Sequence, residues 1–399
     1  MYQIGEPEIQ ALSRVIKSKR LFRYLPGDPS ESILFEREWA EKIGVPFCIA
    51  VSSGTSALTC ALVAAGVEPG DEVLVPGFTF MATALAPLAI GAVPVLCDVD
   101  EALMLDPLDV ARKITSRTKA IIPVHMNGHL VNLDPILKLA RERNLKVVED
   151  ACQCVGGSYK GQRAGSLGDA AAYSFNFFKI ISAGEGGAFV TKDLAGYQRA
   201  KIYHDTGTAW RADAKDLIVP LFAGLNCRID ELRATVLREQ AKRLDGILAG
   251  LRKNVATLRE LLSGGSGYEF APVHSPEGDA GVCLYLRVEN RARALALSEG
   301  IKKRGGAADL PADSGRHIYS NWEPLMQRRG AFHPAIDPLH TTEAGRAQKY
   351  TPDALPRTLE NLARIVSIPT NFDASADDLA CQAKILREAA TVRESARVS

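Results

Sequence analysis

The strongest constraint on the fold is a regular alternation of strand-like and helix-like segments between residues 48 and 192. Short runs rich in β-branched residues recur at 48–53, 72–77, 93–99, 120–126, 146–150, 171–176 and 187–192. Helical patterns of small and apolar residues lie between several of these runs, at 55–66, 79–91 and 134–144. Strands separated by helices are typical of βαβ units, in which helices cover a mainly parallel sheet. The sequence therefore predicts an α/β protein.

A long amphipathic helix separates this region from a different pattern. Leu244, Leu248 and Leu251 fall on one face of a helix that begins near residue 230, and we expect it to bridge to a second domain. Beyond residue 250, helices mix with short strands, and 281–288 is a candidate central strand. The chain has 399 residues, roughly two to three average domains. We therefore predict a large domain over 1–248 and a smaller α+β domain over 249–399.

The two ends of the chain carry weaker signals. Ile9, Leu12 and Ile16 lie at helical spacing, and Pro7 suits a first helical turn, so residues 7–18 are predicted to form an amphipathic helix. The charged tail at 391–399 has no apolar pattern and is expected to fray.

Charge and composition argue against several classes of protein. Lys and Arg total 48 against 47 Asp and Glu, without a long run of either sign, which argues against nucleic acid as a partner. No secretory or membrane-length apolar run is present, so we expect a cytoplasmic protein without a membrane partner. Cys152 and Cys154 form a C-x-C pair without a second pair at metal spacing, so packing is favoured over zinc and no metal site is predicted.

Two local motifs follow predicted strands. Ser53-Gly54-Thr55-Ser56 joins a strand to a helix, where free backbone N–H groups and hydroxyls suit a phosphate. The alternative interpretation is a turn in which a side chain only caps the helix. Asp150 ends the strand VVED, with Gln153 three residues later. A carboxylate at the carboxyl end of a parallel strand faces the crevice in which α/β proteins bind ligands, and there it could keep a ring nitrogen protonated. A helix-capping acid is the alternative interpretation.

Two more motifs lie further along the chain. Lys179 follows a strand in an aromatic setting and precedes a Gly-rich turn. Desolvation would favour its neutral amine, the form that makes an imine, whereas the alternative is a surface lysine. Asn226 and Arg228 precede the long helix in GLNCRIDE. A phosphate cradle, a strand-end acid and an isolated lysine together indicate a pyridoxal phosphate site.

At this point the sequence resembles the DegT/DnrJ/StrS-type sugar aminotransferases, which are fold type I pyridoxal phosphate enzymes. The resemblance begins at FEREWAEKIG (35–44) and covers most of the chain. It is densest in seven ordered segments: SSGTSAL (52–58), PGFTFMAT (76–83), PVHMNG (123–128), EDACQ (149–153), GSLGDAAAYSFNFFK (165–179), GEGGAFVT (184–191) and GLNCRIDE (224–231). It implies a mainly parallel seven-stranded sheet sandwiched by helices, with a smaller C-terminal domain.

The resemblance also implies roles for individual residues. Lys179 would form the imine with the cofactor, Asp150 would pair with the pyridine nitrogen, and His125 would act near the substrate. Other residues would contact the cofactor: Gly54, Thr55, Ser56, Phe80, Gln153, Ser174 and, from a neighbouring subunit, Asn226. Candidate substrate contacts are Asn176, Arg228, His317 and Tyr319. A shared site of this kind implies a homodimer.

The implied activity is transfer of an amino group from L-glutamate or L-glutamine to the carbonyl of a keto sugar, in amino-sugar biosynthesis for lipopolysaccharide or antibiotics. Two departures leave a cyclitol or another non-sugar ketone as the alternative acceptor: SFNFFK replaces the commoner SF-x-P-x-K, and 317–335 differs from the usual pattern. Dehydratases of the family have histidine in place of Lys179. A non-catalytic sensor is the alternative from another class, and intact Lys179, Asp150 and Gln153 argue against it.

Overall fold

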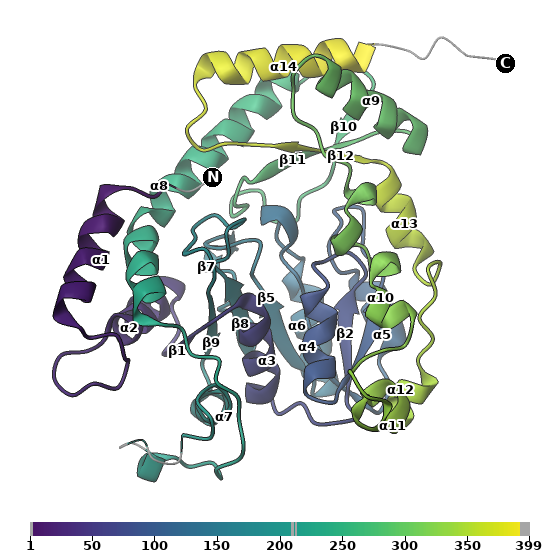
Figure 1. Ribbon diagram of the computed structural model, residues 1–399. Coiled ribbons are helices and arrows are strands. Elements are labelled where there is room, and N and C mark those ends of the chain that lie inside the picture. Colours follow the sequence, from purple (N-terminus) through teal and green to yellow (C-terminus); the bar gives the residue numbers. More distant parts are fainter. Residues whose placement is uncertain (1–2, 209–210, 212–213, 392–399) are drawn as a thin grey trace.

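A seven-stranded sheet forms the centre of the protein in the computed structural model, which describes residues 3–208, 211 and 214–391 (Figure 1). The strand order is β1-β9-β8-β5-β4-β2-β3, and only β9 runs antiparallel to its neighbours. The strands are β1 (Phe47–Val51), β2 (Glu72–Pro76), β3 (Val93–Cys97), β4 (Thr118–Ile121), β5 (Lys146–Asp150), β8 (Ala170–Ser174) and β9 (Gly187–Thr191). The predicted α/β class and mainly parallel sheet are confirmed.

Helices flank this sheet, and three of them begin at polar side-chain caps. The helix α3 (Gly54–Ala64) packs on β8 and β9, α4 (Ala82–Ala89) on β2 and β3, and α6 (Leu133–Arg143) on β5. The side chains of Ser53 and Asp193 accept backbone N–H groups at the starts of α3 and α7 (Leu194–His204), and Asp106 does so at α5 (Pro107–Lys113). The sheet strands are almost fully buried because helices cover them.

Three helices on one side link the sheet to the rest of the molecule. The predicted N-terminal helix is α1 (Glu6–Ser18), and the predicted long helix is α8 (Glu231–Leu262), against which α1 packs. The helix α2 (Glu31–Ile43), which the sequence patterns did not single out, also packs against α8. It is capped by Ser30, and its Phe35 and Trp39 are fully buried against Phe175.

A second, smaller core lies at the far end of α8, at the top of Figure 1. It consists of an antiparallel sheet with β11 (Cys283–Arg287) between β10 (Glu269–Phe270) and β12 (Ile365–Pro369). The helices α9 (Arg291–Lys303) and α14 (Ala376–Thr391) pack against each other beside it. The candidate central strand at 281–288 is therefore confirmed as the middle strand.

A segment beyond the long helix returns to the main body. Its helices are α10 (Glu323–Met326), α11 (Pro338–Thr341), α12 (Glu343–Ala347) and α13 (Pro356–Ala363). Tyr319 and Trp322 are fully buried in the larger core. A division after residue 248 stays a prediction: this position lies inside α8, and part of the chain beyond it packs with the large sheet.

The remaining elements are short. Two-residue strands pair as a hairpin, β6 (Ser158–Tyr159) with β7 (Gln162–Arg163). Single 3-10 turns occur at Met126–Gly128, Ala214–Asp216, Pro311–Asp313, Gly315–His317, Tyr319–Asn321 and Pro334–Ile336. Most of the predicted fraying tail, residues 392–399, lies outside the described residues. Among the helices that are described, none is both long and apolar enough to cross a membrane.

Candidate active site

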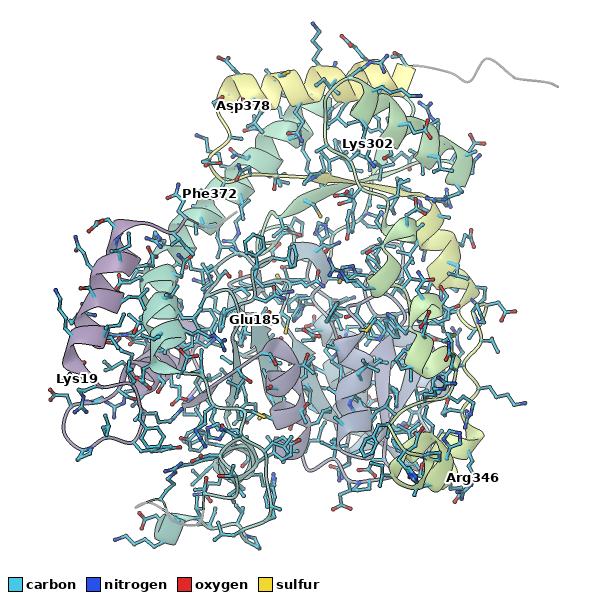
Figure 2. All side chains as sticks on the ribbon, viewed as in Figure 1. Lys19, Glu185, Lys302, Arg346, Phe372 and Asp378 are labelled. Atoms are coloured by element: carbon cyan, nitrogen blue, oxygen red, sulfur yellow. The ribbon has the colours of Figure 1, made fainter. Side chains whose placement is uncertain are left out.

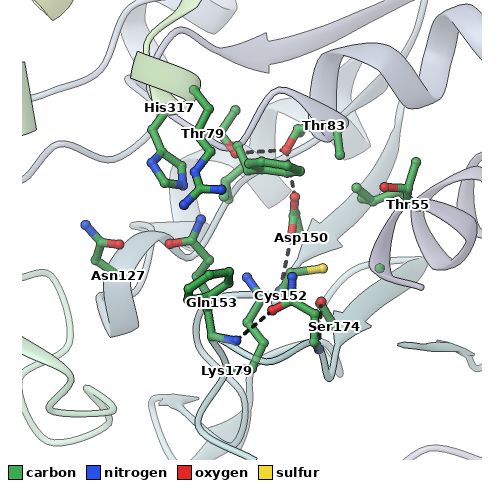
Figure 3. A pocket seen from close by; sticks show the side chains of 18 of the residues that line it. Thr55, Thr79, Thr83, Asn127, Asp150, Cys152, Gln153, Ser174, Lys179 and His317 are labelled. Carbon is green, nitrogen blue, oxygen red and sulfur yellow. Dashed lines mark hydrogen bonds between the residues drawn. The ribbon is translucent and has the colours of Figure 1, made fainter. Parts of the chain in front are cut away.

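A pocket of about 590 Å³ lies where the carboxyl ends of the parallel strands face the smaller core (Figure 3). Loops after β1, β2, β4, β5 and β8 supply most of its wall. Glu185, on the turn before β9, also lines it and lies near the middle of the molecule (Figure 2). Of the residues proposed from the sequence, the pocket brings together Gly54, Thr55, Phe80, Asp150, Gln153, Ser174, Asn176, Lys179 and His317.

Asp150 is fixed at the end of β5 by hydrogen bonds to both carboxylate oxygens. Thr83 Oγ1 donates to Oδ2 at 2.8 Å, and the backbone N–H of Cys152 donates to Oδ1 at 3.1 Å. The Thr79 hydroxyl lies 2.8 Å from the Thr83 hydroxyl and extends this row of hydrogen bonds (Figure 3). The side chain is only 4% exposed in a wall of the pocket. A buried carboxylate held in this way can pair with a cationic ring nitrogen.

The start of α3 leaves a small concave surface beside Ser174. A Cβ on Gly54 would come within 2.7 Å of Ser174 Cβ and 3.1 Å of its Oγ, so only glycine fits there. Ser53 Oγ accepts the N–H of Ser56 at 3.1 Å and caps the helix. The positive end of α3 therefore opens onto the pocket, an arrangement suited to an anion. Ser56 serves in the cap and does not line the pocket.

Lys179 lies in the loop between β8 and β9, opposite Asp150 in the same pocket (Figure 3). Its backbone N–H donates to Asn176 O at 3.1 Å, and the N–H of Phe175 donates to Gly186 O at 2.9 Å. These bonds fold the loop back on itself and hold the lysine half-buried. Nearby, burial and the charge of Asp150 raise the pKa of the Cys152 thiol, which therefore stays protonated.

Another part of the pocket wall comes from segments far apart in the sequence. Phe80 is 39% exposed, and its ring centroid lies 5.9 Å from that of His317. Burial, with the charges of Arg316 and Lys179, lowers the pKa of His317 to about 4, so its ring is neutral at pH 7. Arg316 also lines the pocket and lies over the Phe178 ring at 5.4 Å.

Two predicted site residues do not reach the pocket. His125 is fully buried with both ring nitrogens engaged: Nδ1 accepts the Val131 N–H at 3.2 Å, and Nε2 lies 3.0 Å from Glu149. Tyr319 is also fully buried, and its hydroxyl donates to Pro352 O and accepts the Leu355 N–H. Neither side chain lines the pocket, so the structure corrects the expectation that they act on substrate.

Arg228 and Asn226 also lie away from the pocket of their own chain. Arg228 forms an ion pair with the buried Asp205, which Arg211 and Tyr24 contact as well. Within its own chain, Arg228 is therefore held in a structural ion pair, and a substrate contact for it stays a prediction. Asn226, two residues before Arg228, is exposed, and its backbone pairs with that of Asp205.

Several pocket residues carry no sequence signal of their own. Thr83 is an ordinary helix residue in the sequence, and its hydrogen bond to Asp150 spans 67 positions. Asn127 has a positive φ of 51° and lines the pocket, and Asn in the PVHMNG segment could have suggested a left-handed residue. Val282, which directly precedes β11, and Asp309, whose backbone pairs with Ser367 of β12, complete the wall.

The arrangement of this pocket can be compared with known proteins. A model of the DegT/DnrJ/EryC1/StrS aminotransferase family matches residues 2–309, which include Gly54, Asp150 and Lys179. The chain belongs to this family. The resemblance expected from the sequence is thus confirmed, and the chain is an enzyme of the aminotransferase class.

Individual relatives of this family member differ in what they act on. GDP-perosamine synthase of Caulobacter vibrioides is 40% identical over 230 residues, 57% of this chain and 61% of that protein. L-glutamine:2-deoxy-scyllo-inosose aminotransferase of Streptomyces lividus is 34% identical over 339 residues, 82% of this chain and 78% of that protein. The crystal structure of 3-amino-5-hydroxybenzoic acid synthase superposes with a TM-score of 0.80 at 30% identity, covering 98% and 97% of the two chains. This likeness confirms the fold type I architecture.

Proposed function

We propose that this aminotransferase uses pyridoxal phosphate to move an amino group from L-glutamate or L-glutamine to the carbonyl of a keto sugar. The observation that carries the proposal is the meeting of Lys179, Asp150 and the start of α3 in one pocket. An anion site, a buried acid and a lysine are the three groups that this cofactor needs.

The residues of the pocket fit the cofactor on their own chemistry. Gly54 and Ser174 leave a surface at the start of α3 that a Cβ would fill, and backbone N–H groups there suit the phosphate. Phe80 would cover a ring face, and Gln153 would lie near the ring hydroxyl. Asp150 would hold the proton on the ring nitrogen, because Thr83 and Cys152 keep its carboxylate in place.

The chemistry divides between the cofactor and the chain. When bound, pyridoxal phosphate supplies an electron-accepting ring that stabilises the charge left by proton removal from an amino acid. Lys179 would take that proton from the α carbon through its Nζ atom and pass it to the cofactor's C4′ carbon, and it would move a proton the opposite way in the second half of the reaction. Arg316 would attract the donor's carboxylate, and Val282 and Asp309 would help to exclude water.

The acceptor is proposed as a keto sugar, with a keto cyclitol as the second candidate. Sugar-acting relatives such as GDP-perosamine synthase support the first. The second is supported by the scyllo-inosose aminotransferase, whose match extends over more of this chain. It is also supported by the unusual segment 317–335, which brings His317 into the pocket.

We also propose a homodimer in which each site is completed by Asn226 of the other subunit. In one chain Asn226 lies outside the pocket and is exposed. Large apolar side chains are exposed on the same segment and on the Lys179 loop, at Ile218, Leu221, Phe222, Leu225, Phe177 and Phe178. Exposed apolar surface of this kind suits a protein partner.

Borohydride reduction of the loaded enzyme tests the cofactor assignment. We expect the cofactor to become covalently attached to Lys179, and Lys179→Ala to abolish turnover. The matched control is Lys192→Ala, which removes an exposed lysine outside this pocket and should leave the rate unchanged. Peptide mass mapping reads the label, and a label on another lysine would contradict the proposal.

The acceptor is tested by product mass. The enzyme, glutamine or glutamate, and either a nucleotide-linked keto sugar or scyllo-inosose derivatives are incubated and the aminated product is detected. Preferential amination of the keto sugar supports the first candidate, whereas preferential amination of the cyclitol replaces it with the second.

A further inference from the structure

A second group of reactive side chains lies where β11 of the small sheet meets the larger core. His129 Nδ1 lies 2.5 Å from Asp279 Oδ2, and His129 Nε2 lies 3.6 Å from Cys283 Sγ. The order is carboxylate, imidazole, thiol, with the ring between its two partners. The proposed aminotransferase mechanism uses none of the three.

The imidazole in this cluster is held in its charged form. Burial opposes protonation, but the Asp279 carboxylate and the neighbouring Cys283 outweigh it and raise the pKa of His129 to about 10. At pH 7 both ring N–H groups therefore donate, one toward Asp279 and the other toward the Cys283 sulfur. A cation beside a thiol favours the thiolate, which is the nucleophilic form.

Cys283 is buried, with 5% of its surface exposed, but it borders a cavity. Cys283 lines a second cavity of about 420 Å³, which shares Asn127, Val282, Asp309 and His317 with the cofactor pocket. Lys302, on α9 in the upper part of the molecule, adds positive charge to its wall (Figure 2). The cavity is large enough to admit a molecule as small as hydrogen peroxide.

Other cysteines of the chain lack this environment. Burial raises the pKa of the Cys48, Cys60 and Cys97 thiols and that of Cys154, which donates to Gly128 O at 3.1 Å. Among the described cysteines, Cys283 is the one whose sulfur contacts an imidazole, and Cys381 is exposed on the surface.

We propose that Cys283, activated by His129 and Asp279, is a modification site that small hydroperoxides oxidise to a sulfenic acid. The thiol first loses its proton to solvent. The thiolate then attacks one peroxide oxygen, so that an S–O bond forms while the O–O bond breaks. Sulfur is oxidised by two electrons and the peroxide is reduced. The departing oxygen takes the proton of His129 and leaves as water, and His129 regains a proton from solvent.

Asn127 connects the Cys283 site to the cofactor pocket. The Cys283 thiol donates to Asn127 O at 3.5 Å, while Asn127 Nδ2 donates to Tyr285 at 2.7 Å. Asn127 itself lines the cofactor pocket. An oxygen added to the sulfur therefore changes the packing of a residue in that pocket.

The test compares thiols within one protein. The full chain is treated with hydrogen peroxide at pH 7, sulfenic acid is trapped with dimedone, and each cysteine peptide is quantified over time. We expect Cys283 to react about tenfold faster than the exposed Cys381, because His129 lies beside the Cys283 sulfur and would stabilise the attacking thiolate. A rate at Cys283 equal to or below that at Cys381 overturns the proposal.

Two variants test the part played by the imidazole. His129→Gln should slow trapping at Cys283 about tenfold, while Cys381 is unaffected, and the exposed His333→Gln should change neither rate. If His129→Gln does not fold, Asp279→Asn keeps both ring and thiol and should also slow the reaction. Circular dichroism checks folding. An unchanged rate at Cys283 in a folded variant contradicts the assignment.

Discussion

At the scale of single residues, the hydrogen bond from Thr83 to Asp150 is the contact most open to test. Thr83→Val keeps the shape but removes a donor from a buried carboxylate, which costs about 1–3 kcal/mol. We expect weaker cofactor binding and a half-reaction with glutamate slowed about tenfold or more. Thr83→Ser retains the hydroxyl and is the matched control. Absorbance changes of the cofactor measure both its binding and the rate of the half-reaction. An unchanged half-reaction rate in Thr83→Val would contradict a role for this hydrogen bond.

The sequence identified site residues only where a local pattern carries the chemistry. Gly54 begins α3, Asp150 ends β5 and Lys179 lies in the loop after β8, and the structure brings all three into one pocket. His125 also follows a strand, yet its ring is turned to Val131 and Glu149. The direction of a side chain depends on partners distant in sequence, so a motif gives its position but not its contacts.

At the scale of elements, the start of α3 depends on close packing against β8. In Gly54→Ala, the new methyl group would lie 2.7 Å from Ser174 Cβ and would push the helix away from the proposed phosphate site. We expect about 1–3 kcal/mol lower stability and clearly weaker cofactor binding. The control is Gly246→Ala in the exposed face of α8, where no atom lies within 4 Å. That change should stabilise the protein by about 0.5–1 kcal/mol. Denaturant titrations with and without cofactor distinguish the two, and equal effects would refute the close contact.

The link between α7 and the segment before α8 depends on the buried Asp205. Burial opposes its ionisation, but hydrogen bonds from Arg211 and Tyr24 outweigh it and lower the pKa of Asp205 to about 2. An unfolded aspartate titrates near 3.9, so the unfolded chain binds more protons between pH 4 and 2. The stability that Asp205 contributes is therefore present above about pH 4 and is lost as the pH falls through 2.

Asp205→Asn tests this contribution. The change leaves Arg211 and Arg228 without their carboxylate, so we expect about 3 kcal/mol lower stability at pH 7 and a flatter acid dependence below pH 4. The exposed Asp373→Asn should leave both properties unchanged. Chemical denaturation at a series of pH values measures them, and an acid profile identical to that of the unmodified protein would show that Asp205 does not contribute.

Local periodicity predicted the helices and strands far better than it predicted how they assemble. The helix α8 and the central strand β11 both follow from apolar spacing. The antiparallel direction of β9 does not, because it depends on how the loop that carries Lys179 returns to the sheet. The sequence around Trp322 does not indicate that this segment packs in the larger core, because that core includes residues more than 200 positions away.

At the scale of the whole molecule, the proposed homodimer makes a prediction about mixed subunits. Lys179→Ala and Asn226→Ala chains should each be poor alone, because every site in either dimer lacks one residue. A mixed dimer has one site with both residues intact and one site that lacks both. Random exchange makes about half of the dimers mixed, each with half of its sites restored, so about a quarter of native activity should return. Differently tagged chains confirm the exchange independently, and a mixture of Lys179→Ala with Lys179→Arg chains is the control that must stay inactive. Sedimentation should give a dimer or a larger assembly. A confirmed mixed dimer without activity, or an active monomer, would show that each chain builds its site alone.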